Sequence, residues 1–344
     1  MNMKRFLTIS IIAAAALSAA SCAIEGSSEA NEAQKAYIES WMEVNHPGIK
    51  PTGIGIYILD DTPGTGAAWT SDYTYVFVDY TVRSLDGTIV QTNSEKLNRQ
   101  LGKYSLSECY DPIAWAIGEN YCYAGVEEIL TGMKVGGTRQ AVIPSWLLTT
   151  SRYSSAEEYL ETSVDTSPLI YTLTLKNMTK DIKKHSLDVL SKYIDSKFGA
   201  GASKDSTYYN NKDGLKEGFY FKSIKQPSDS IIPSGSTGYL WYIGRRLDGS
   251  VFDTNIADTA KVHNIYSPSR TYEPASVTFA ETYTDIKFNE STAITGFQAA
   301  MCHMHAYEEA TAVFYYGLGY SGTAQTGIPA YSSLRFDLQL VDKQ

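Results

Sequence analysis

Residues 241–255, WYIGRRLDGSVFDTN, and residues 79–93, DYTVRSLDGTIVQTN, carry one pattern twice. Each copy contains Leu-Asp-Gly, then Ser or Thr, a mainly apolar segment and a closing Thr-Asn. Asp-Gly between two runs of β-forming residues predicts a hairpin, because glycine adopts positive φ without steric cost. An internal repeat of this length predicts that the chain holds two copies of one structural unit.

The similarity of the two copies continues on both sides of the hairpin. Each copy is expected to contain a leading amphipathic helix, a strand, the hairpin, a short helix and two more strands, which is an α+β domain. Apart from the hairpins, the expected segments are 33–48, 53–61, 124–148 and 167–177 in the first copy and 185–201, 217–225, 295–322 and 332–342 in the second.

The N-terminus is typical of a targeting segment. Lys4 and Arg5 precede a short apolar stretch, Phe6 to Leu17, and small residues then lead to Cys22. This order resembles a bacterial lipoprotein signal cut before a lipidated cysteine. The alternative is an ordinary secretory signal cut nearby. We therefore expect a signal peptide at 1–21, lipid on Cys22, a tether at 22–34, and domains at 35–180 and 181–344.

Composition narrows the classes of partner. The formal net charge of the 344 residues is -9, with no long basic run, which argues against nucleic acid as a partner because phosphate binding needs clustered Lys and Arg. Beyond Cys22 the cysteines are Cys109, Cys122 and Cys302. A bridge between Cys109 and Cys122 and three free thiols are both open from the sequence.

The second copy resembles the FKBP-type peptidyl-prolyl cis–trans isomerases over residues 235–343, and the first resembles them more loosely over 73–178. Tandem units of this kind behind a lipoprotein signal are similar to proteins that Bacteroidetes-type bacteria export. The residues that carry the resemblance are Tyr242, Leu247-Asp248-Gly249, Phe252-Asp253-Thr254, Ile294-Thr295-Gly296-Phe297, Met304, Gly319-Tyr320, Gly327-Ile328-Pro329 and Leu334-Arg335-Phe336-Asp337-Leu338.

The resemblance implies a strongly curved antiparallel sheet wrapped on the short helix, enclosing an apolar site for proline that we call the cup. It assigns the cup floor to Phe297, a polar group at the rim to Asp253, and a hydroxyl donor for a substrate carbonyl to Tyr320. Phe288 is a further candidate whose register is open. The other residues that the resemblance places in the cup are Tyr242, Phe252, Ile294, Ile328 and Phe336.

Two departures from this pattern bear on activity. Residues 255–287 form a long insert that could cap the cup, widen its specificity or obstruct it. In the first copy, Val90-Gln91 replaces Phe-Asp and Val126 stands at the floor position. We expect the first domain to be catalytically silent and to act as a scaffold or a protein-binding module.

Residues 302–305, Cys-His-Met-His, raise the possibility of a metal site, since these side chains are soft or borderline ligands. The alternative is that only Met304 packs inward at the end of the short helix while its neighbours point to different faces. We favour packing and expect neither a metal nor a cofactor, because rotation about an amide requires neither.

The sequence thus predicts a lipid-anchored folding helper for exported proteins, with isomerase activity in the second domain and proline-containing polypeptides as substrates. Periplasm-facing attachment to a membrane of the cell envelope is favoured, and surface exposure stays open. The main alternative is a non-catalytic peptide-binding module on the same fold. A glycan-binding surface lipoprotein is a third hypothesis, which rests on the many tyrosines.

Overall fold

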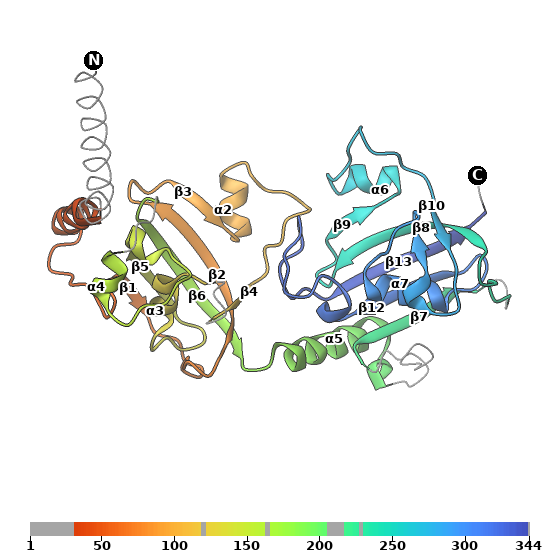
Figure 1. Ribbon diagram of the computed structural model, residues 1–344, viewed down its shortest axis with the longest axis horizontal. Helices are drawn as coiled ribbons and strands as arrows, with labels where there is room; N and C mark the ends of the chain where they lie inside the picture. Colours follow the sequence, from red (N-terminus) through yellow and green to blue (C-terminus); the bar gives the residue numbers. More distant parts are fainter. Residues whose placement is uncertain (1–30, 118–121, 162–165, 205–216, 227–229, 343–344) are drawn as a thin grey trace, which may run out of the picture. The chain divides into compact units, whose positions relative to one another are not determined.

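The computed structural model (Figure 1) describes residues 31–117, 122–161, 166–204, 217–226 and 230–342. The chain divides into two compact units. One comprises Met1–Ser94 and Trp115–Lys180, and the other comprises Glu95–Ala114 and Asp181–Gln344. The architecture is α+β, with one antiparallel sheet in each unit.

The first unit is built on a six-stranded sheet in which the central path runs β1-β5-β6-β2-β3 and β4 also pairs with β2. Within the described range, residues 31–45 are helical, and this leading helix ends three residues before its predicted end. The remaining helices of this half of the sequence are α2 (Glu95–Gln100), α3 (Ala124–Leu130), η1 (Ser145–Leu147) and α4 (Ala156–Leu160). The strands are β1 (Tyr57–Thr62), β2 (Tyr75–Ser84), β3 (Ile89–Thr92), β4 (Ile113–Ala116), β5 (Thr138–Ile143) and β6 (Leu169–Thr179).

The second unit is built on a seven-stranded sheet in the order β11-β10-β8-β13-β12-β7, with β9 also pairing with β8. Its helices are α5 (Ile182–Phe198), η2 (Ala202–Lys204), α6 (Ala257–Val262), η4 (Tyr283–Asp285), α7 (Thr295–His303) and η5 (Tyr316–Leu318). Its strands are β7 (Phe219–Lys225), β8 (Thr237–Arg246), β9 (Val251–Thr254), β10 (Ala275–Thr278), β11 (Lys287–Phe288), β12 (Glu309–Phe314) and β13 (Leu334–Val341).

The two sheets share one topology. The path β1-β5-β6-β2-β3 of the first sheet corresponds strand for strand to β7-β12-β13-β8-β9 of the second, which confirms the predicted α+β fold with two similar units. The short strands β4 and β11 were not predicted. Both lack a long alternating run of apolar residues, so hydropathy alone gives them no signal.

The two repeated hairpins have the same local structure. Gly87 and Gly249 have φ of 88° and 92°, a conformation that costs a glycine little. The preceding aspartates, Asp86 and Asp248, accept a hydrogen bond from the backbone N–H two residues on, at 2.9 and 2.8 Å. The register of strand pairing shifts just before each turn, in β2–β3 and in β8–β9. The Leu-Asp-Gly motif is therefore a turn signal.

The closing Thr-Asn of the repeat fastens the hairpin to its own first strand. Asn255 accepts a hydrogen bond from the backbone N–H of Tyr242 at 2.9 Å and donates to the carbonyl oxygens of Leu240 and Glu273 at 2.8 and 2.9 Å. In the first copy, Asn93 accepts from the backbone N–H of Tyr80 at 2.7 Å. Both asparagine side chains are buried. The motif thus satisfies backbone groups that the irregular pairing leaves open.

The core of the second unit lies between α7 and the inner face of its sheet. Leu240, Tyr242, Phe336 and Leu338 on neighbouring strands belong to this core. Gly296 allows the close approach, because a Cβ there would lie 2.4 Å from the ring of Phe314. On the outer face, α5 packs through Leu190 and Ile194 against Tyr220 and Val313. One face of the sheet is thus buried against α7, and α5 covers part of the other face.

Cys109, Cys122 and Cys302 form no disulfide with one another, which agrees with the alternative of three thiols. Within the described ranges, no helix has both the length and the apolar character needed to cross a membrane. The predicted signal peptide, the lipidated Cys22 and residues 22–30 of the tether lie outside the described residues.

Candidate functional site

Aromatic rings from five elements of the second unit meet at the predicted cup. Tyr242 on β8 lies with its ring centroid 5.7 Å from those of Phe288 on β11 and Phe297 on α7. Phe297 lies 4.8 Å from Phe336 on β13, and Phe336 lies 5.7 Å from Phe252 on β9. Most of these contacts are tilted or edge-to-face, which are favourable arrangements for aromatic pairs. The strand order thus brings together rings that are up to 94 residues apart in the sequence.

The apolar residues of the cup differ in exposure according to their place. Tyr242, Phe297, Ile328 and Phe336 are 4–6% exposed and form the deep part. Half-buried side chains pack against them at the rim, namely those of Phe252, Phe288, Ile294 and Tyr320. The predicted apolar and aromatic residues of the cup therefore belong to one cluster, and Phe288, whose register was open, joins them. Their roles in binding or catalysis stay predictions.

A hydrogen-bonded carboxylate lies at the rim. Asp253 accepts a hydrogen bond from the Tyr242 hydroxyl at 2.7 Å through Oδ2 and forms an ion pair with Arg270 through Oδ1. The Arg270 guanidinium also donates to the Tyr242 hydroxyl at 2.8 Å. These three side chains close a triangle of charge-assisted hydrogen bonds, which are stronger than neutral ones.

Arg270 was missed by the sequence analysis. It comes from the insert, between α6 and β10, 17 positions after Asp253. A signal was present, because a carboxylate at an apolar rim needs a cation and Arg270 is the sole arginine of residues 255–287. Nothing in the spacing, however, shows that the insert folds back onto β9.

The tyrosine hydroxyls of the site hold their protons firmly. Burial, together with the carboxylate of Asp253, raises the pKa of Tyr242 far above its ordinary value. The same two causes raise the pKa of Tyr320. Among the described residues the Tyr320 hydroxyl has no hydrogen-bond partner. It is therefore a protonated donor that is available to a ligand.

The loop that supplies Ile328 is fastened from the hairpin. Arg246, at the end of β8, is 4% exposed and donates to the carbonyl oxygen of Gly327. It also pairs with Asp248 of the turn, at 3.3 Å. This contact links the Asp-Gly turn to the rim of the cup, which gives the repeated motif a second role in this copy.

The equivalent region of the first unit is built differently. Val126 is buried at the position of Phe297, and Val90, at the position of Phe252, is 56% exposed. Trp115 on β4, which was not predicted to contribute, places its ring 5.3 Å from that of Tyr80. The buried Tyr171 lies nearby, and its pKa is raised by burial and by its neighbours Tyr123, Cys122 and Tyr80. No carboxylate stands where Asp253 stands in the second unit, because that position is Gln91.

The side chains of residues 302–305 point to different surroundings. His303 stacks on Phe219 at 5.5 Å, Met304 is buried in the core, and Nδ1 of His305 lies 3.3 Å from Glu308. The sequence predicted a turn at residues 302–304. In the structure α7 continues through Cys302 and His303. This spread matches the packing interpretation of the motif.

Comparison with known proteins finds a similarity for one segment of the chain. Residues 68–176 match the model of the family described as FKBP-type peptidyl-prolyl cis-trans isomerase. The chain is 33% identical over 70 residues to a short-type peptidyl-prolyl cis-trans isomerase of Methanocaldococcus jannaschii, an alignment that covers 20% of this chain and 44% of that protein. The chain thus spans less than half the length of this curated relative. The matched residues lie wholly within the first copy, whose cup is altered and whose resemblance to the family the sequence analysis gave as the looser of the two.

Two solved structures are similar at low level. The three FKBP domains of wheat FKBP73 give a TM-score of 0.29 at 17% identity, covering 83% of this chain and 94% of that one. FkpA from Escherichia coli gives 0.30 at 21% identity, covering 52% and 73%. TM-scores this low do not support an assignment of the fold, which is based instead on the two sheets described above.

Proposed function

We infer that a chain in which residues 68–176 form an FKBP-type domain catalyses cis–trans isomerisation of X-Pro bonds, and we place the activity in the second unit. The observation that carries this proposal is the rim of its cup, where Tyr242, Asp253 and Arg270 are hydrogen-bonded over a floor of Phe297 and Phe336. Proline-containing polypeptides are the substrates.

Rotation about an X-Pro bond requires no chemical group from the protein, only surroundings that favour the twisted amide. The barrier to rotation about a peptide bond is about 18–20 kcal/mol because rotation breaks amide resonance. The twisted amide is less polar than the planar one, so a dry aromatic cup favours it over the ground state. Buried rings of Tyr242, Phe297 and Phe336 provide such surroundings for the proline.

Hydrogen bonds at the rim would hold the peptide on either side of the rotating bond. Tyr320 offers a free hydroxyl to a substrate carbonyl. Asp253 keeps the hydroxyl of Tyr242 and the guanidinium of Arg270 oriented. Donors that are fixed before the substrate arrives need no reorganisation during the reaction.

We further propose that the chain is exported and lipid-anchored through Cys22, and that it assists the folding of exported proteins on the periplasmic side. The support is the order of charged, apolar and small residues in 1–22. The similarity to exported proteins of Bacteroidetes-type bacteria stays a prediction. Metabolic labelling with a fatty-acid analogue tests the anchor, since label that persists in Cys22→Ala would contradict it.

The second candidate is a non-catalytic peptide-binding module. The structural observation that favours it is Arg270, which reaches from the insert to the rim of the cup. A guanidinium there restricts the space through which a peptide enters. The two functions differ in one measurable quantity, the rate of cis–trans exchange.

The experiment is cis–trans exchange of an X-Pro peptide with the full chain. We expect acceleration that falls about tenfold in Tyr320→Phe, the change for losing one hydrogen bond of about 1.4 kcal/mol. Tyr307→Phe, which removes an exposed hydroxyl bonded to Asp342, is the matched control and should leave the rate unchanged. If the folded chain does not accelerate the exchange, the isomerase proposal is wrong and the binding module is the better account.

The pH dependence follows from the tyrosines. Burial and the carboxylate of Asp253 raise the pKa of Tyr320 above 10.0, so its donor form persists across neutral and mildly alkaline pH. We expect kcat/KM to be flat between about pH 7 and 9. A loss of activity centred below pH 9 and absent from Tyr320→Phe would contradict the role of this hydroxyl.

A further inference from the structure

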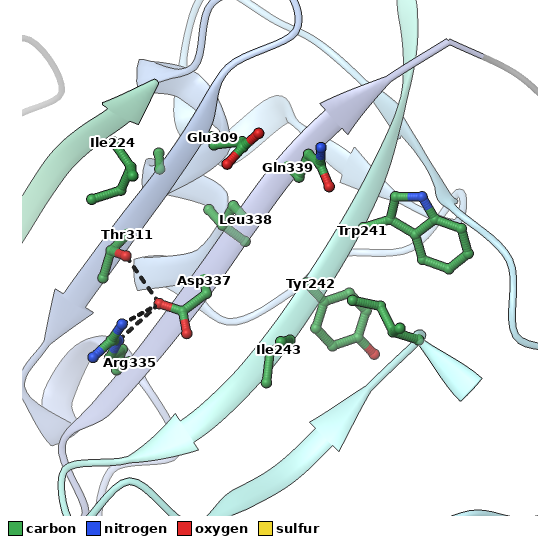
Figure 2. A pocket seen from close by; sticks show the side chains of 12 residues that line it. Ile224, Trp241, Tyr242, Ile243, Glu309, Thr311, Arg335, Asp337, Leu338 and Gln339 are labelled. Atoms are coloured by element: carbon green, nitrogen blue, oxygen red, sulfur yellow. Dashed lines mark hydrogen bonds and ion pairs between the residues drawn. The ribbon is translucent and has the colours of Figure 1, made fainter. Parts of the chain in front are cut away.

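A second concave site lies on the opposite face of the same sheet from the cup. Figure 2 shows it along β12, β13 and β8, with Glu309, Thr311, Asp337 and Gln339 pointing to one side. The cavity has a volume of about 350 Å³, at the small end of the range for ligand sites. One lining residue, Tyr242, also belongs to the cup, but the polar side chains of this cavity have no part in the proposed isomerase reaction.

The register of the sheet places the lining in rows across the strands. Trp241, Gln339 and Glu309 are direct neighbours on β8, β13 and β12. The next row holds Ile243, Asp337 and Thr311. Because side chains alternate between faces, all six point away from the cup. The first row therefore sets an indole, an amide and a carboxylate side by side.

The second row is a supporting network in which one carboxylate, that of Asp337, is shared by two arginines. Asp337 accepts from Thr311 at 2.9 Å and from Arg335 at 2.8 Å through Oδ1, and from Arg245 at 2.9 Å through Oδ2. Arg335 in turn donates to the Tyr193 hydroxyl of α5 at 3.3 Å. These contacts fix the base of the cavity and link its lining residue Arg335 to α5.

The first row is left available. Among the described residues, the indole N–H of Trp241 and the side-chain amide of Gln339 have no hydrogen-bond partner. Glu309 is held only by an exposed Lys225, at 3.7 Å. This row offers one donor, one group that both donates and accepts, and one acceptor, next to an apolar ring face.

The first unit shows that the fold does not require this surface. The positions equivalent to Trp241, Gln339 and Glu309 are Asp79, Thr174 and Thr138. There the hydroxyls of Thr138 and Thr174 satisfy each other at 2.8 Å. The first sheet therefore has small side chains at these positions, and their hydroxyls are hydrogen-bonded to each other. The aromatic and amide groups are an addition peculiar to the second unit.

We propose that this cavity binds a neutral saccharide. Each ring hydroxyl both donates and accepts, which suits a mixed row, and the C–H face of the sugar ring suits the face of Trp241. A carboxylate ligand would meet Glu309, and an ammonium ligand would meet Arg335. An extended peptide is recognised mainly by pairing at a sheet edge, whereas this surface is a sheet face whose backbone groups are already paired.

The test is retention of the full chain on an array of immobilised neutral and acidic oligosaccharides, followed by titration with each free sugar that binds. We expect binding to neutral members, weakened about tenfold or more in Trp241→Ala and less in Trp241→Phe, which keeps an aromatic face. Gln339→Ala should weaken it as well. Asp79→Ala and Thr174→Ala, the equivalent positions of the first sheet, are the matched controls and should leave it unchanged.

The variant Asp253→Ala distinguishes saccharide binding at the cavity from activity at the cup on the other face of the sheet. Saccharide binding should be unchanged in this variant, even though the variant is placed to impair the cup. The proposal is overturned if the array retains nothing, if only acidic sugars are retained, if Trp241→Ala binds as tightly as the unaltered chain, or if an X-Pro peptide displaces the sugar.

Discussion

Replacing Asp253 by alanine is expected to lower kcat/KM for X-Pro exchange by about a hundredfold, equivalent to about 2.7 kcal/mol. The carboxylate orients two groups at once, the hydroxyl of Tyr242 and the guanidinium of Arg270. Hydrogen bonds to a charged group contribute about 1.5–3 kcal/mol each. Without the acid, neither donor is held at the rim when the amide twists.

The repeat supplies the control for this prediction. Gln91 stands at the equivalent position of the first unit, where it is exposed, and Gln91→Ala should leave kcat/KM unchanged. Both variants are measured as full chains with the same peptide. A loss in Gln91→Ala alone would show that the activity resides in the first unit, and no loss in either variant would remove Asp253 from the mechanism.

Replacing Asn255 by alanine is expected to destabilise the second unit by about 3 kcal/mol, since each buried polar group left unsatisfied costs about 1–3 kcal/mol. Asn255 is 4% exposed and holds the N–H of Tyr242 and the carbonyl oxygens of Leu240 and Glu273. Without it, three backbone groups near the cup lose their partner.

Hydrogen exchange measures this effect unit by unit, which a single melting temperature does not do in a chain with two compact units. In Asn255→Ala, protection should fall in β8 and β9 and persist in β2 and β3. Asn93→Ala should show the reverse pattern, because Asn93 holds the equivalent hairpin. Asn45→Ala, on the exposed end of the leading helix, controls for the loss of an amide. Equal protection in all three variants would contradict the role given to the motif.

The sequence was sufficient for the features that depend on local pattern. The Asp-Gly turns, the amphipathic leading helices and the short helices follow from spacing within each element. The apolar cup was predicted from its resemblance to a family, and the positions of Phe297, Phe336 and Ile328 agree with it.

Features that depend on long-range folding were not predicted. Arg270 reaches Asp253 only because the insert turns back on β9, and Trp115 reaches Tyr80 only because β4 pairs with β2. The rows on the outer face of the second sheet depend on the register of three strands. Periodicity gives the face on which a side chain lies but not its neighbour on the next strand.

Because Arg270 reaches the rim of the cup from the insert, the rim can change in evolution without changes in the repeated unit. The cation at the rim belongs to a segment outside the repeated unit, whereas the carboxylate and the rings belong to the unit itself. On the proposed function, changes within residues 261–274, none of which is buried, would therefore alter which peptides enter while the core of the fold keeps its packing. Randomising this stretch and selecting for different residues before proline would treat the insert as an exchangeable specificity element.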